Sequence, residues 1–288
     1  MSLQRRIGRL AIAIALAGLS STAAWAADAA CEPAKAAQKY PTLAGKTLRI
    51  GADPQTPPYV FRDANDFSKL VGVDAELAKA VMDCAGVKFE FVPGAWSGLL
   101  PAVQSGQLDL MWDDLYYKPE RAKVVDFATY MTAATGALVP AGNPKKIDGL
   151  PGLCGQTVSF AIGSSNEGVT RKQSEACVAS GKPAIVAMPF QDLAAGLRLL
   201  ESGRTDAILW DLGFVDNLAS TQKQKFARGF AVMDGYLIGV AVAKNRPELL
   251  RLVHEGLAAV QASGEQKKIF HKYGVDAGLV SPTTIKTE

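Results

Sequence analysis

The chain has 288 residues, of which 48% are hydrophobic and 20% charged, and its 31 lysines and arginines exceed its 28 acidic residues by three. This ordinary globular composition excludes a disordered chain, a collagen-like repeat and the large basic surplus of a nucleic-acid-binding protein. The surplus comes from Arg5, Arg6 and Arg9, since residues 1–26 contain no acidic side chain. The rest of the chain has no net formal charge, so its total charge indicates no partner.

The first 26 residues have the parts of a secretory signal peptide. A basic start is followed by the apolar run Leu10–Leu19 and then by the small residues Ala24 and Ala26. The apolar run is too short for a permanent membrane span. We therefore expect a signal peptide at 1–26, an N-terminal extension at 27–45 and a periplasmic protein.

The four cysteines are expected to form disulfides, because an exported protein enters an oxidising compartment. No two of them have C-x-x-C spacing, and the only two histidines lie in a C-terminal amphipathic stretch, so no metal site is expected. Locality favours Cys154 with Cys177, which leaves Cys31 with Cys84. Buried free thiols are the alternative.

The hydrophobic pattern alternates between strands and helices in two successive series. Strands alternating with helices predict two α/β lobes with mainly parallel sheets. The first series is expected as strand 47–53, helix 71–87, strand 88–93, helix 97–105 and strand 108–112, and the second as a strand from 156, helix 165–179, strand 184–190, helix 191–202 and strand 206–210.

An internal similarity relates the two series. The segment 105–115, SGQLDLMWDDL, resembles 202–212, SGRTDAILWDL, and in both a helix stops at Ser-Gly and a buried strand ends in Trp and Asp. Ser-Gly alone could be ordinary helix-to-strand punctuation. The carboxyl end of a strand is nevertheless where open α/β sheets bind ligands.

Acidic and aromatic side chains gather at these predicted strand ends. Alternation along the strand predicts Trp112 and Asp114 on one face and Asp113 on the other. Aromatic rings together with carboxylates suit a cationic organic group, although core packing is the alternative for the rings. The candidates are Asp53, Asp113, Asp114, Asp211, Tyr59, Trp96, Trp112, Tyr116, Tyr117 and Trp210.

Two further features suit an anionic group. Arg121 follows YYKPE and could present its planar guanidinium to a ligand carboxylate, or it could form a surface pair with Glu120. Ser164 and Ser165 follow a predicted strand and open a predicted helix. They could hold an anion at the helix N-terminus or act as a helix cap.

Several motifs together resemble one family over Leu48 to Gly274. They are LRIGADPQTPPYVF, LVGVDAELAKAV, WSGLLPAVQSGQLDLM, KPERAKVVDF, QTVSFAIGSS, SGRTDAILWD and the stretch beginning YLIGVAVAKNRPELL. The chain resembles the extracellular solute-binding proteins of family 3, the polar amino acid receptors of ABC importers. The resemblance implies two lobes that close like a hinge. Lobe 1 would comprise 46–138 and return at 236–288 with the C-terminal helices, lobe 2 would comprise 139–235, and the crossings would fall near 137–143 and 234–240.

The resemblance also implies roles for individual residues. Arg121 would bind a substrate carboxylate with help from Ser164 and Ser165, and Asp211 would bind the α-ammonium. Asp53 would lie at the rim of the first lobe and Trp96 would stack on the substrate.

This chain departs from the family at Asp114 and Tyr116, where a small residue and then Thr or Ser are usual. The extra acid and ring point to a small cationic or zwitterionic amine, enclosed by Trp96, Trp112 and Tyr116. We expect a monomeric, non-enzymatic receptor without a cofactor, which delivers an amine or amino acid to an inner-membrane ABC permease.

Two other classes remain open. The same fold hosts exported enzymes such as cyclohexadienyl dehydratases, and paired acids such as Asp113 and Asp114 can perform acid–base chemistry. Some members of the fold are also accessory proteins of periplasmic dehydrogenase systems. Against an enzyme, the sequence has no Ser-His-Asp set, no metal cluster and no cysteine expected to act as a nucleophile.

Overall fold

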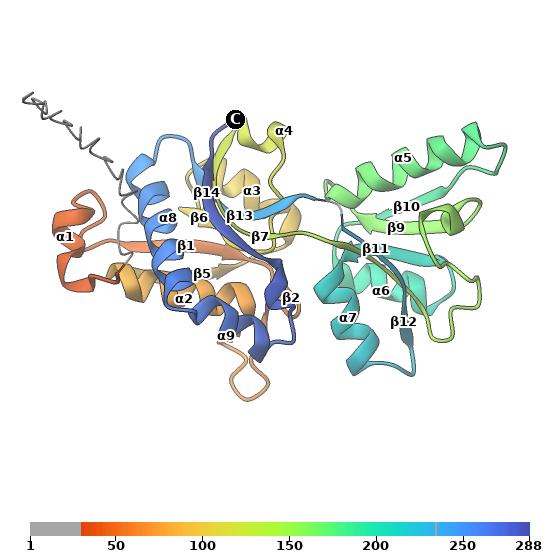
Figure 1. Ribbon diagram of the computed structural model, residues 1–288, viewed down its shortest axis with the longest axis horizontal. Helices are drawn as coiled ribbons and strands as arrows, with labels where there is room; N and C mark the ends of the chain where they lie inside the picture. Colours follow the sequence, from red (N-terminus) through yellow and green to blue (C-terminus); the bar gives the residue numbers. More distant parts are fainter. Residues whose placement is uncertain (1–29, 234) are drawn as a thin grey trace, which may run out of the picture.

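Two α/β lobes, each built on its own sheet, make up the protein (Figure 1). The computed structural model describes residues 30–233 and 235–288, so the predicted signal peptide at 1–26 lies outside the described residues. Within the described ranges, no helix is both long enough and apolar enough to cross a bilayer.

The sheet of the first lobe has six strands in the order β14-β7-β13-β6-β1-β5. β1 pairs in parallel with β5 and β6, whereas β13 and β14 run antiparallel to their neighbours. The strands β2, β3 and β4, which lie between β1 and β5 in the sequence, form a separate small antiparallel sheet. The strands are β1 (Thr47–Ala52), β2 (Gln55–Thr56), β3 (Val60–Arg62), β4 (Leu70–Val71), β5 (Lys88–Pro93), β6 (Leu110–Met111), β7 (Val125–Thr132), β13 (Leu237–Ala243) and β14 (Val280–Lys286).

The sheet of the second lobe has five strands in the order β10-β9-β11-β8-β12. β9 pairs in parallel with β10 and β11, whereas β8 is antiparallel to β11 and β12. Both sheets are therefore mixed, which corrects the prediction of mainly parallel sheets. The strands are β8 (Thr135–Pro140), β9 (Thr157–Ala161), β10 (Val186–Phe190), β11 (Ala207–Asp211) and β12 (Phe226–Val232).

The antiparallel pairs follow from the two crossings between the lobes. The chain leaves the first sheet at the end of β7 and enters the second at β8, so the first crossing lies at 133–134. It returns between Val232 and Leu237. The predicted boundary at 138 therefore falls inside β8, because the apolar crossing strand gives no local signal of the sheet to which each part belongs.

Helices cover both faces of the first sheet. Leu110 and Met111 belong to different apolar clusters, because successive residues of a strand face opposite sides. The first cluster includes side chains of α2 and α8, and the second includes Leu99 and Val103 of α3. The helices of this lobe are η1 (Pro33–Lys35), α1 (Ala36–Lys39), α2 (Val73–Ala85), α3 (Trp96–Gln104), α4 (Pro119–Ala122), α8 (Pro247–Ala262), α9 (Glu265–Lys272) and η3 (Ala277–Leu279).

Among the described residues, the second lobe has fewer helices than the first. Its helix α5 has the bounds that the sequence predicts. Asp192 caps α6 by accepting a hydrogen bond from the Ala195 N–H. The second disulfide, Cys154–Cys177, joins the segment before β9 to α5, as predicted. The helices are η2 (Leu150–Leu153), α5 (Ser165–Ala179), α6 (Leu193–Glu201) and α7 (Leu212–Thr221).

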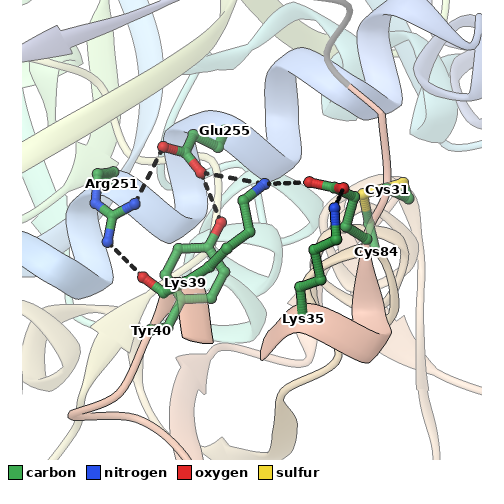
Figure 2. A network of polar contacts seen from close by, with 8 residues as sticks. Cys31, Lys35, Lys39, Tyr40, Cys84, Arg251 and Glu255 are labelled. Atoms are coloured by element: carbon green, nitrogen blue, oxygen red, sulfur yellow. Dashed lines mark hydrogen bonds and ion pairs between the residues drawn. A yellow bond between two sulfur atoms is a disulfide. The ribbon is translucent and has the colours of Figure 1, made fainter. Parts of the chain in front are cut away.

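The N-terminal extension is fastened to the first lobe by covalent and polar contacts (Figure 2). The disulfide Cys31–Cys84, also as predicted, joins it to α2. The Tyr40 hydroxyl donates to Glu255 of α8 at 2.8 Å, and Arg251 lies over the Tyr40 ring. These contacts hold a segment that has few buried apolar side chains of its own.

The C-terminal strand β14 is not among the elements predicted from the sequence. It pairs with β7, and the Thr129 hydroxyl lies 2.8 Å from that of Thr284. The segment VSPTTIK contains proline and polar residues. Its extended form therefore depends on pairing with β7.

Candidate functional site

A narrow cavity lies between the two lobes. The space inside it that is open to water-sized molecules is about 30 Å³, so the lobes are nearly closed on one another. Every residue that lines the cavity, except Asn166, is a candidate predicted from the sequence. The lining residues are Trp96, Asp114, Tyr116, Arg121, Ser164, Ser165, Asn166, Trp210 and Asp211.

Trp210 and Asn166 are lining residues of the second lobe to which the sequence gives no individual role. Trp210 stacks on Phe190, with ring centres 5.7 Å apart, and the Asn166 side-chain oxygen accepts a hydrogen bond from the Thr135 hydroxyl at 3.1 Å. Trp210 precedes Asp211 at a strand end, which is the signal that makes it a candidate in the sequence. Asn166 is simply the second residue of α5.

Arg121 is held by both lobes. Its Nη1 donates to the Tyr116 carbonyl oxygen at 2.7 Å, and its Nη2 donates across the cleft to the Gly163 carbonyl oxygen at 2.9 Å. The guanidinium carbon lies 5.3 Å from the centre of the Trp96 ring, within cation–π range. Burial lowers the Arg121 pKa to about 10, which leaves the group charged at neutral pH.

Asp211, a residue of the second lobe, accepts hydrogen bonds from the first lobe. It ends β11 and caps α7, where its Oδ1 accepts from the Gly213 N–H at 2.8 Å. Two phenols of the first lobe donate to the same carboxylate, Tyr59 to Oδ1 at 2.6 Å and Tyr116 to Oδ2 at 3.1 Å. Burial raises the Asp211 pKa to about 6. Tyr59, which does not line the cavity, thus reaches the site through Asp211.

Asp53 does not line the cavity, but it positions Trp96, which does. Its Oδ2 accepts from the Trp96 N–H at 3.0 Å, at the start of α3, and its Oδ1 accepts from the Gln55 N–H at 3.1 Å. A carboxylate at a helix N-terminus is a favourable arrangement. Asp53 therefore fixes the helix that carries Trp96, whereas the sequence predicts Asp53 at the rim.

The prediction that Trp112 and Asp114 share a strand face is wrong. β6 ends at Met111, so the alternation does not extend to these residues. Trp112 is fully buried in the core of the first lobe, with its ring centre 6.1 Å from that of Tyr130. Asp114 has a positive φ of 48° and lines the cavity. Trp112 is a core residue and does not form a wall of the site.

The start of α5 provides the second-lobe wall. Ser164 is the N-cap residue, but its side chain makes no cap hydrogen bond. The buried Ser164 hydroxyl also has no hydrogen-bond partner elsewhere in the described part of the chain. Lys118 of the first lobe donates to the Ser164 carbonyl oxygen at 3.3 Å. This hydroxyl is well placed to bond to a group inside the cavity.

Two carboxyl groups of the first lobe, Asp113 and Asp74, are buried and do not line the cavity. Asp113 accepts from the Asp53 N–H and from the Thr56 hydroxyl, and burial raises its pKa well above the usual range. Asp74 accepts from the Tyr130 hydroxyl at 2.6 Å, and burial raises its pKa to about 6. Burial therefore disfavours the charged form of both carboxyl groups.

Comparison with known proteins places this geometry in one family. The profile of the bacterial extracellular solute-binding proteins, family 3, matches residues 48–276. The chain belongs to this family. The match covers the second sheet, the first sheet apart from Thr47 and β14, and every residue that lines the cavity, and it excludes the N-terminal extension.

Relatives of this solute-binding protein are amino acid-binding proteins. The L-cystine-binding protein TcyJ of Escherichia coli (strain K12) is 28% identical over 237 residues, covering 80% of this chain and 84% of that protein. A solved structure of an ancestral arginine-binding protein bound to arginine is 31% identical, with a TM-score of 0.71. That comparison covers 79% of this chain and 97% of the ancestral one.

One similar solved structure is that of a binding protein from which an enzyme descends. The ancestral amino acid-binding protein AncCDT-1, a precursor of cyclohexadienyl dehydratase, is 30% identical with a TM-score of 0.67, covering 79% of this chain and 94% of that chain. It is itself described as a binding protein. The relatives are thus mostly binding proteins, on a fold that also led to a dehydratase.

Proposed function

We propose that this protein is an exported receptor that closes its lobes on a small amine-containing solute and delivers it to an ABC importer. The solute is an amino acid or a related cationic or zwitterionic compound. One observation carries this proposal: Arg121, Asp114 and Asp211 line the same cavity between the lobes. A zwitterion has the matching pair of opposite charges.

The cavity has separate groups for each end of such a solute. Arg121 keeps its charge, and the two hydrogen bonds described above use only part of the five-donor capacity of its guanidinium. Together with the Ser164 hydroxyl it suits a carboxylate. Asp114 and Asp211 supply negative charge for an amine, and Trp96 supplies a ring face.

Features of the chain support a periplasmic location for this receptor. The signal peptide predicted at 1–26 and the two disulfides suit the periplasm. Membership of family 3 supports an inner-membrane ABC permease as its partner. A monomer suffices for this function, since both walls of the cavity come from one chain.

Calorimetric titration of the exported protein tests this function. The panel contains L-arginine, L-glutamine, L-cystine, glycine betaine, putrescine, succinate and maltose. We expect saturable binding of at least one amine or amino acid and none of maltose. Binding of maltose or of dicarboxylic acids alone would contradict the proposal, because the buried acids disfavour a solute without a cation.

Mass spectrometry of the bound solute separates a receptor from an enzyme. A receptor returns the solute unchanged after prolonged incubation, whereas a dehydratase releases water and a lighter product. Incubation with cyclohexadienyl acids is the informative arm, because the AncCDT-1 lineage led to that activity. Turnover in this arm would overturn the assignment as a receptor.

A further inference from the structure

We infer that Tyr59 and Tyr116 form a closing contact with Asp211, which favours the closed arrangement of the lobes whether or not a solute is bound. Both tyrosines belong to the first lobe, and Asp211 belongs to the second. The two hydrogen bonds, of 2.6 Å and 3.1 Å, therefore exist only while the lobes are together.

Burial strengthens these bonds, and the shorter one, from Tyr59, is the stronger of the two. Tyr59, Tyr116 and Asp211 are exposed by only 1%, 5% and 4% of their surfaces. Hydrogen bonds to a carboxylate are stronger than bonds between neutral groups, and exclusion of water strengthens them further. Opening the hinge would break both bonds, so they stabilise the closed lobes.

The Asp211 carboxylate is also fixed in direction before the lobes meet. Its Oδ1 accepts from the Gly213 N–H at 2.8 Å, within its own lobe. The backbone N–H of Phe214 also bonds to it and lowers its pKa. With both phenols added, most of the usual acceptor positions of the carboxylate are used by the protein itself, so Asp211 offers a solute mainly its charge. Asp211 therefore serves the contact between the lobes.

Gly213 makes room for this contact. A methyl group at this position would lie 2.6 Å from the Tyr59 hydroxyl oxygen and 3.2 Å from Asp211 Oδ1. No side chain larger than hydrogen fits there without moving the phenol. Gly213 is thus a positioning residue for the contact between Tyr59 and Asp211.

A contact that stabilises the closed lobes and a contact with the solute change the measured affinities in different ways. A bond made only in the closed state raises the closed population and so improves the affinity for every solute by the same factor. A residue that touches the solute changes the affinity for one solute more than for another. The first effect needs no knowledge of the solute.

Small-angle scattering of the solute-free, full-length exported protein is the direct test. We expect the Tyr59→Phe/Tyr116→Phe double variant to have a larger radius of gyration than the wild type. Tyr40→Phe is the matched control, because it removes a phenol–carboxylate bond of 2.8 Å to Glu255 within one lobe (Figure 2). An unchanged radius in the double variant would overturn the inference, and this outcome would not bear on the proposed function.

Titration with L-arginine and L-glutamine is the second measurement, and it alone rests on the proposed function. Each Tyr→Phe change is expected to weaken both solutes by about tenfold and by the same factor. A loss confined to one solute would make these tyrosines solute contacts and contradict a closing role. If the wild type binds neither solute, the scattering result decides the inference.

A third variant acts without removing a hydroxyl. Gly213→Ala should enlarge the radius of gyration of the wild type, because the new methyl group displaces Tyr59. The same change should have less effect in the Tyr59→Phe background, since the clash involves the hydroxyl. Equal effects in the two backgrounds would contradict the contact between Gly213 and the phenol.

Discussion

The side chain of Asp74 determines the backbone of Asp114. Asp74 Oδ2 accepts the Asp114 N–H at 2.6 Å, and Asp114 has a φ of 48°, a conformation that L-residues rarely adopt. The second oxygen of Asp74 accepts from the Tyr130 hydroxyl at 2.6 Å. A carboxylate buried in α2 thus directs an acidic side chain into the cavity between the lobes.

This burial predicts that Asp74 contributes to the pH dependence of stability. Its pKa is about 6 in the folded protein against an ordinary 3.8, so the folded state binds the proton more tightly. The stability contributed by protonated Asp74 is complete below pH 3.8 and is lost as the pH rises to about 6. The difference corresponds to about 3 kcal/mol of unfolding free energy.

Urea unfolding of the wild type and Asp74→Asn across pH 4 to 7 measures this contribution. The unfolding free energy of the wild type should fall relative to that of Asp74→Asn over this range. Asp83→Asn changes an exposed carboxylate on the same helix and is the matched control. Parallel pH profiles for the wild type and Asp74→Asn would show that Asp74 does not titrate in this range.

Asp114→Asn should change selectivity between solutes. Asparagine tolerates a positive φ, so the backbone is retained while the negative charge is lost. We expect the affinity for L-arginine to fall at least tenfold more than that for L-glutamine, as for removal of one partner of a buried charge pair. Asp126→Asn is the control, since Asp126 is a buried acid paired with Lys244 outside the cavity. An equal loss for both solutes would contradict a role of Asp114 in selectivity, because both solutes carry the same α-ammonium.

Arg121→Ala should abolish the advantage that a carboxylate gives a solute. We expect L-arginine to lose about 100-fold in affinity, whereas agmatine, which lacks the carboxylate, should lose much less. Calorimetry on both solutes gives the comparison. Arg228→Ala, which removes an exposed ion pair with Asp216, is the control. Equal losses for the two solutes would assign Arg121 to closure through Gly163 alone.

Loss of the disulfide between Cys31 and Cys84 should destabilise the first lobe without changing solute affinity. The bridge closes a loop with a sequence separation of 53 residues. A loop of this length corresponds to about 4 kcal/mol in the chain-entropy account. Urea unfolding of Cys31→Ser/Cys84→Ser measures the loss, and Cys154→Ser/Cys177→Ser is the control in the other lobe. A fall in solute affinity for the first pair would contradict independence, since neither residue lines the cavity.

Local patterns predict most elements of the fold because their residues lie within a few positions of one another. The helix at Ser165–Ala179 and the strand at Lys88–Pro93 have the predicted bounds. The strand predicted at 108–112 is reduced to Leu110–Met111, because its pairing with β1 and β13 ends there. β14 escapes prediction, since a polar segment becomes a strand only by pairing with β7.

In the candidate site, too, the local sequence predicts some features, and contacts between distant segments determine the others. Strand-end position identifies Asp113 and Asp114 equally, yet only Asp114 lines the cavity, and Trp112 belongs to the core. The bond that turns Asp114 spans 40 residues, and the bond between Tyr59 and Asp211 spans 152. Neither contact leaves a pattern in the local sequence.

The sequence by itself determined the family resemblance, the alternation of strands and helices, the cysteine pairs and the chemical types of residue at the strand ends. These features depend on composition, spacing and neighbouring positions. Only the tertiary structure decided which acids face the cavity, where the chain crosses between lobes and how Asp211 contacts two tyrosines. The reason is physical, because burial and hydrogen bonding between distant segments set the direction of each side chain, and they arise only when the two lobes are packed together.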